Sequence, residues 1–179
     1  MYTIISGSNR KSNRTLPFAQ FAHAHLNQNG QSAHLLDLCS LSGSLVYDTM
    51  YSKEDQPDMI SQIQQDIFIP TDKFWFFVPE YNGSYPGVIK VLLDTMSTVD
   101  IQKTFQHKKA MLTGVASGRA GNLRGMDHLA EVLNHLGVHV HPNKKPISSI
   151  YQFLDEQNQL THDKMKEELM VQAEAFCEF

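Results

Sequence analysis

The chain has 179 residues, of which 41% are hydrophobic and 19% are charged, and such a chain usually forms one domain. Its formal net charge is −4, which argues against a general nucleic-acid binder, because such proteins neutralise phosphates with clustered lysine and arginine. No stretch approaches the roughly 18 consecutive apolar residues of a membrane span, and the first residues do not resemble an export signal. We therefore expect one cytoplasmic domain over residues 1–179 that binds neither nucleic acid nor membrane.

Short apolar runs alternate along the chain with longer segments of helical periodicity, which is the pattern of repeated strand–helix–strand units. Strands are predicted at residues 2–6, 33–38, 74–78, 110–115 and 138–141. Helices are predicted at residues 13–27, 57–68, 87–97, 123–136 and 162–176. The third strand is apolar throughout, as expected of a central strand covered on both faces. With right-handed crossovers, these elements predict an α/β fold with a doubly wound parallel sheet of five strands in the order 2-1-3-4-5.

Ligands of such sheets bind at the carboxyl ends of the strands, so the loops after the first, third and fourth strands are candidates. Residues 7–15 form the first loop, which combines serine and threonine hydroxyls, the cation of Arg10 and the start of a helix. These groups suit a phosphate monoester. An ordinary turn with Ser12 or Asn13 as helix caps is the alternative interpretation. The loop contains neither Gly-x-Gly-x-x-Gly nor Gly-Lys-Ser/Thr, the turns expected for a dinucleotide or a nucleoside triphosphate.

The second and third loops carry features that suit a flat ligand and a second anion. Residues 79–87 contain two prolines and two glycines, so the turn is rigid and its backbone can approach a ring closely. Tyr81 or Tyr85 is positioned to cover an aromatic ring. Residues 116–122 contain two further glycines and Arg119, which is either a cation for a nicotinamide nucleotide phosphate or a solvated loop arginine.

Two motifs resemble a known family. They are Gly7-Ser8-Asn9-Arg10 with Ser12, and Pro79-Glu80-Tyr81-Asn82-Gly83-Ser84 followed by Pro86-Gly87-Val88-Ile89-Lys90 and Asp94. Over about residues 2–141 the chain is similar to the NAD(P)H-dependent FMN reductases, flavodoxin-like proteins that include quinone, azo-dye and chromate reductases. The resemblance implies that the FMN phosphate is bound by Ser8, Arg10, Ser12, Asn13 and Thr15. It implies that the isoalloxazine is bound by Pro79, Glu80, Tyr81, Asn82 and Gly83 and flanked by Ser117 and Gly118.

The expected function is therefore that of an FMN-dependent oxidoreductase. It would pass a hydride from NADPH or NADH to the flavin and on to a small acceptor, which is a quinone, a flavin, an azo compound or a metal ion. No catalytic residue is predicted, because the cofactor supplies the chemistry and Glu80 is the only carboxylate in the three loops. Two alternatives stay open: a flavodoxin-like electron-transfer module, which usually has a strongly acidic docking face, and a flavin-free regulatory scaffold.

Other polar and apolar features receive weaker interpretations. The chain has two distant cysteines, Cys39 and Cys177, and no Cys-x-x-Cys pair. His139 and His141 share a strand face, but no further ligand lies at a matching spacing, so no metal site is predicted. The resemblance implies a homodimer or homotetramer. We expect the helix from Pro86 and residues 47–54 near the subunit contact, because Val88, Val91, Leu92, Thr95 and Met96 spread over more than one helix face.

Overall fold

The computed structural model describes residues 1–41, 43, 45–52 and 54–179. Its strands form one sheet in the order β2-β1-β3-β4-β5, and all of their pairings are parallel. This confirms the predicted strand order and the flavodoxin-like α/β class. The strands are β1 (Tyr2–Ser6), β2 (Ala33–Asp37), β3 (Lys73–Pro79), β4 (Lys109–Val115), β5 (His139–Val140) and β6 (Lys145–Ile147).

The last strand position differs from the prediction. Instead of one strand over residues 138–141, two short strands share the outer edge of β4. β5 pairs with Lys109 and Ala110, and β6 pairs further along β4, at Thr113 to Val115. The break falls at Pro142, which has no N–H group to continue the hydrogen-bond ladder. The chain leaves the sheet there and returns three residues later.

Each predicted helix has a helical counterpart in the structure, but several begin or end at other residues than predicted. α3 (Gly87–Ser97) has the predicted bounds, whereas α1 (Leu16–Gln28) begins three residues after the predicted start. The predicted helix 57–68 divides into α2 (Asp58–Ile63) and a π-helical turn, η1 (Gln64–Phe68). The remaining helices are α5 (Leu123–His135) and α6 (Asp163–Glu178), together with two short elements that were not predicted, α4 (Ile101–Phe105) and the 3₁₀ turn η2 (Ile150–Phe153).

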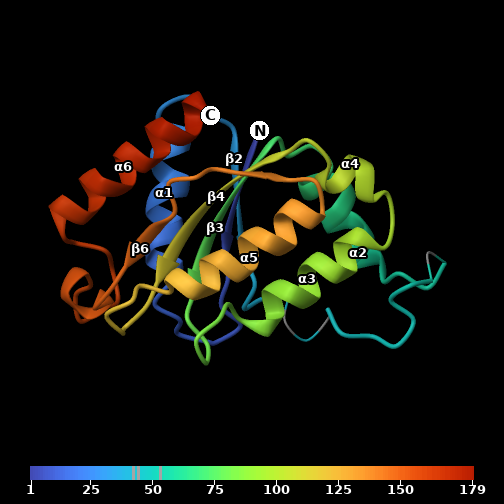
Figure 1. Ribbon diagram of the computed structural model, residues 1–179, viewed down its shortest axis with the longest axis horizontal. Coiled ribbons are helices and arrows are strands. Elements are labelled where there is room, and N and C mark those ends of the chain that lie inside the picture. Colours follow the sequence, from blue (N-terminus) through green and yellow to red (C-terminus); the bar gives the residue numbers. More distant parts are fainter. Residues whose placement is uncertain (42, 44, 53) are drawn as a thin grey trace.

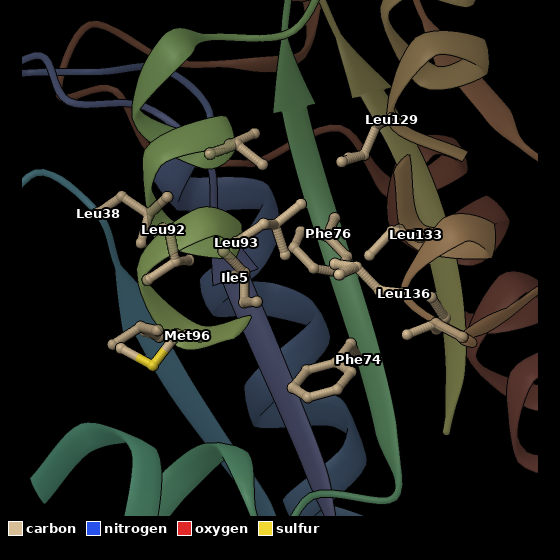
Figure 2. Close-up of a cluster of buried hydrophobic side chains, with 14 of the residues drawn as sticks. Ile5, Leu38, Phe74, Phe76, Leu92, Leu93, Met96, Leu129, Leu133 and Leu136 are labelled. Carbon is tan, nitrogen blue, oxygen red and sulfur yellow. The ribbon is translucent and has the colours of Figure 1, made fainter. Parts of the chain in front are cut away.

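Helices cover both faces of the sheet (Figure 1). Successive residues of a strand point to opposite faces, so the apolar β3 supplies two cores. Phe74 and Phe76 pack with α3 and α5, as Figure 2 shows, while Trp75 and Phe77 pack with α1 and α6. This explains why β3 has no polar alternation. All five residues from Phe74 to Val78 are fully buried.

Polar groups also fix α6 against the sheet. The Trp75 indole donates to Thr113 Oγ1 at 2.8 Å, and Thr113 donates to Gln172 Oε1 of α6 at 2.8 Å. At the end of the helix, Lys73 Nζ donates to the carbonyls of Phe176 and Cys177 at 2.8 and 2.9 Å. A cation at this position complements the partial negative charge of a helix C-terminus. Burial lowers the pKa of Lys73.

The parallel sheet brings all strand carboxyl ends to one edge. Within that edge, the first loop begins against β3, because Gly7 N donates to the Phe77 carbonyl at 2.9 Å. A Cβ on Gly7 would lie 2.8 Å from the same carbonyl oxygen and 2.6 Å from Ile89 Cδ1. Only glycine fits this contact without displacing its neighbours. The start of the first loop and the end of β3 are therefore held together by backbone.

We predict that Phe76→Ala destabilises the protein by about 3–5 kcal/mol, the usual cost of truncating a buried phenylalanine. The ring is fully buried between α3 and α5. The matched control is Val171→Ala, because Val171 lies on α6 with 64% of its surface exposed, and its unfolding free energy should change by less than about 0.5 kcal/mol. Urea denaturation of cofactor-free protein measures both values. Equal effects of the two substitutions would contradict this packing.

Candidate cofactor site

A cavity of about 350 Å³ lies at the carboxyl edge of the sheet. Its volume falls in the range of small-molecule sites in proteins. The structure brings together in its lining every residue that the sequence proposed as cofactor-binding: Ser8, Arg10, Ser12, Asn13, Thr15, Pro79, Glu80, Tyr81, Asn82, Gly83, Ser117 and Gly118. The residues come from three loops that are far apart in sequence, so their convergence depends on the parallel strand order.

The Asn13 side chain shapes the first loop. Its Oδ1 accepts hydrogen bonds from the backbone N–H groups of Thr15 and Leu16 at 3.2 and 2.8 Å. Its Nδ2 donates to the Arg10 carbonyl at 3.2 Å. Because Asn13 uses its amide to close the turn before α1, the helix begins at Leu16 and not at residue 13. The Thr15 and Leu16 N–H groups are thus occupied by Asn13, and Pro17 has no N–H group. An anion at this turn would therefore rely on the hydroxyls and the arginines of the lining.

A hydrogen bond joins the first loop to the second. The hydroxyls of Ser8 and Tyr81 lie 3.0 Å apart, and Arg10 N donates to Ser8 Oγ at 3.3 Å. Ser8 is almost fully buried. The two loops that the sequence assigned separately, one to a phosphate and one to a ring, therefore meet directly within the cavity wall.

The second loop is a tight hairpin turn. Tyr81 N donates to the Ser84 carbonyl at 2.9 Å and Ser84 N donates back at 3.1 Å. Asn82 and Gly83, with φ of 51° and 78°, form the corner between them. Two successive residues with positive φ define a type I′ turn, for which Asn-Gly is the preferred pair. Ser84 Oγ lies 2.9 Å from His128 Nδ1 on α5, so the helix supports the turn from outside.

The structure distinguishes between the two candidate tyrosines. Tyr81 lines the cavity, whereas Tyr85 is not among the lining residues and packs against the core beneath α3 and α5. Burial raises the pKa of the Tyr85 phenol. Arg119 is exposed and also lies outside the lining. Its proposed contact with a nucleotide phosphate stays a prediction.

One wall of the cavity was missed by the sequence analysis. It is formed by Tyr151 and Ile150 of η2 together with Arg14, whose guanidinium carbon lies 4.9 Å from the Tyr151 ring centroid in a cation–π contact. Backbone hydrogen bonds dock this segment, with Ala116 N donating to the Ile147 carbonyl at 3.0 Å. The available signal was β-branched Ile147 directly after Pro146, with Ile150 three residues later. This pattern is too short to predict a strand by periodicity.

The loops contribute different chemistry to the lining. The first loop supplies hydroxyls and the guanidinium groups of Arg10 and Arg14, and Glu80 is the only carboxylate among the lining residues. The second loop and the end of β4 add the Asn82-Gly83 turn and apolar Val115 and Ala116. An anionic group and a flat, partly apolar ring would both find matching groups in this lining. The residues present therefore fit FMN.

Metal binding finds no support in the described residues. Among them, no group of three or more histidine, cysteine or acidic side chains could hold a metal ion. His139 stacks on His107 with ring centroids 6.3 Å apart, and His141 packs edge-on against Phe179 at 4.9 Å. Aromatic packing thus accounts for both histidines of the β5 region. In the same described ranges, no helix is long and apolar enough to cross a membrane.

Comparisons with known proteins agree with the cavity. A profile of the family described as NADPH-dependent FMN reductase matches residues 2–152. An NAD(P)H-dependent FMN reductase of Pseudomonas aeruginosa is 32% identical over 143 residues, 78% of this chain and 75% of that protein. A 2-hydroxy-1,4-benzoquinone reductase of a Burkholderia species is 30% identical over 119 residues, covering 66% of this chain and 63% of that protein.

Among solved structures, the flavoenzyme NAD(P)H:(acceptor) oxidoreductase FerB of Paracoccus denitrificans superimposes with a TM-score of 0.82. The match covers 99% of this chain and 94% of that one at 22% sequence identity, which supports the fold. The fold is that of the flavodoxin-like proteins. On the profile match and the sequence identities, this chain belongs to the NADPH-dependent FMN reductase family.

We predict that Arg10→Ala weakens FMN binding about tenfold, because a charge-assisted hydrogen bond to the phosphate would be lost. That factor corresponds to about 1.4 kcal/mol. Lys11→Ala is the matched control. It removes a positive charge next to Arg10 in sequence, but Lys11 is not among the cavity-lining residues. Quenching of FMN fluorescence measures both affinities. An unchanged affinity in Arg10→Ala, or equal losses in the two variants, would contradict the assignment of the phosphate to this loop.

Proposed function

We propose that this protein oxidises NADPH or NADH with FMN held in the carboxyl-edge cavity, and that it passes the reducing equivalents to a small acceptor such as a quinone, a flavin, an azo compound or a metal ion. One observation carries the proposal: the three loops that follow β1, β3 and β4 line a single cavity that combines hydroxyls and arginines with a turn and apolar residues suited to a flat ring. Membership of the family supports the cofactor and the nicotinamide donor.

The chain contributes binding and orientation. We assign the FMN phosphate to the start of α1, where Ser8, Ser12 and Thr15 offer hydroxyls and Arg10 offers a cation. We assign the isoalloxazine to the Asn82-Gly83 turn, with Tyr81 beside it and Ser117 and Gly118 on the other side. When bound, FMN supplies the redox chemistry by accepting a hydride and passing reducing equivalents on.

No general acid or base is required of the protein in this scheme. Hydride transfer needs the two reacting rings in contact and correctly aligned, so a rigid pocket is the protein's main contribution. The rigid elements are the hydrogen-bonded turn at Tyr81 and Ser84 and the partly buried hydrogen bond between Ser8 and Tyr81. Glu80, the one carboxylate of the lining, has no assigned role in proton transfer.

A planar, conjugated acceptor fits the proposal best. The acceptor must approach the same flavin face as the nicotinamide, and a quinone can stack there after the nucleotide leaves. The relative named for reduction of a benzoquinone supports this class. We further propose that the protein acts in the cytoplasm, where NADPH and NADH are produced.

We predict ping-pong kinetics, because one flavin face would serve two substrates in succession. Double-reciprocal plots at several quinone concentrations should be parallel. In the absence of oxygen, NADPH or NADH should bleach the visible flavin absorbance of the FMN-loaded protein, and a quinone should restore it. If neither nucleotide bleaches the flavin while a protein partner rapidly reoxidises chemically reduced protein, the enzyme proposal fails and the electron-carrier alternative replaces it.

The proposed oligomer needs a revised surface. Of the α3 residues expected at a contact, Leu92, Thr95 and Met96 are buried within the chain's own fold. The described part of residues 47–54 remains a candidate, because Tyr51 is 83% exposed, and Val46, which directly precedes this segment, is 73% exposed. Lys53 lies outside the described residues. Large exposed apolar side chains close together in sequence are typical of contact surfaces.

We predict a dimer or tetramer by light scattering, and a shift toward the monomer mass of 20.3 kDa when Val46 and Tyr51 are both replaced by aspartate. Charge placed in an apolar contact opposes association. The paired control is Val171→Asp on α6, which is also exposed and should leave the mass unchanged. A monomeric wild-type protein at micromolar concentration would contradict the proposal.

A further inference from the structure

Asn122 lies behind the cavity and connects two of its loops. It directly precedes α5, is only 1% exposed and is not among the cavity-lining residues. Its Nδ2 donates to the carbonyls of Val78 and Pro79 at 3.0 and 2.9 Å. These are the last two carbonyls of β3, immediately before the loop assigned to the isoalloxazine. One amide therefore ties the start of the second loop to the end of the third.

Gly125 provides the space for this amide. A Cβ at position 125 would lie 2.1 Å from Asn122 Oδ1 and 2.7 Å from both Cγ and Nδ2. Real side chains do not approach so closely, so any other residue at position 125 would push the amide aside. Glycine inside a helix costs up to about 1 kcal/mol relative to alanine. In the first turn of α5, that cost is offset by the room it leaves for Asn122.

The conformation of Asn122 is itself costly. Its backbone is left-handed, with φ of 61°, a conformation that asparagine tolerates better than most residues. Its Oδ1 is buried and has no hydrogen-bond partner. It does not accept from the first turn of α5, as a capping asparagine would. The left-handed backbone and the unpaired Oδ1 are both unfavourable, and the two hydrogen bonds to β3 are what Asn122 gains in return. The contact with β3 is therefore important to the structure.

We propose that Asn122 is a positioning residue for the flavin ring and that Gly125 is required because it admits the Asn122 amide. This inference rests on the proposed placement of FMN. Pro79 pairs with Val115 across β3 and β4, so the second and third loops leave the sheet side by side. The amide sets their separation just beyond the last paired residues. The width of the ring end of the cavity, between Gly83 and Gly118, then depends on it.

The test uses two single variants and their combination. Asn122→Gly keeps a residue that accepts positive φ and removes the amide. Gly125→Ala keeps the amide and displaces it. We expect each to weaken FMN binding about tenfold, and at saturating FMN we expect each to change the visible circular dichroism of the bound flavin. In the Asn122→Gly background, Gly125→Ala should cause no further loss, because there is no amide left to displace.

Two controls separate positioning from general stability. His107→Gly also replaces a non-glycine residue with positive φ, 64°, at the opposite edge of the sheet, and should leave affinity and spectrum unchanged. Asn122→Asp keeps the shape and loses the donor, so it should reproduce the loss and keeps the test valid if Asn122→Gly does not fold. Wild-type affinity and spectra in any of the folded Asn122 or Gly125 variants would overturn the inference. A loss of FMN affinity in the double variant equal to the product of the two single losses would also overturn it. Failure of the wild-type protein itself to bind FMN would overturn the proposed function instead.

Discussion

The parallel pairing of β1, β3 and β4 is the constraint on which the rest of the structure depends. It buries every residue from Phe74 to Val78 and supplies aromatic side chains to both cores. It also places three carboxyl ends side by side, which is why loops more than 100 residues apart along the chain can enclose one cavity. Stability and site formation thus have the same origin. A one-residue shift in the register of β3 would exchange the aromatic residues that its two faces present to the two cores, and it would displace the loop that follows β3.

Close contacts refine what the sheet brings together. At the first loop, Gly7 lies against the Phe77 carbonyl, and at the third, Gly114 has no room for a Cβ beside the Gly121 carbonyl. Non-glycine residues with positive φ occur in each segment around the cavity, at Ser12, Asn82, Asn122 and Ser149. Such conformations persist where the surrounding structure fixes them, and they cluster at functional sites. The buried cores provide the free energy that holds these conformations in place.

Sequence periodicity predicted those elements whose bounds are set by local sequence patterns. The bounds of β1 and α3 were correct, because an apolar run or a helical repeat ends there at a glycine, proline or polar residue. The pairing of two short strands with one edge of β4 was not predictable, because it depends on contacts distant in sequence. The Tyr151 wall was missed for the same reason. The three loops and the family resemblance pointed to twelve of the seventeen lining residues. They could not show that Tyr85 packs against the core or that the Asn13 amide closes the turn before α1.

The central claim is that FMN spans this cavity with its phosphate at the start of α1 and its ring at the Asn82-Gly83 turn. A crystal structure of the FMN complex tests it most directly. The account predicts phosphate density within hydrogen-bond distance of the Ser8 to Thr15 loop and ring density between Gly83 and Gly118. A flavin bound in the reverse orientation, or at another surface of the molecule, would contradict the account.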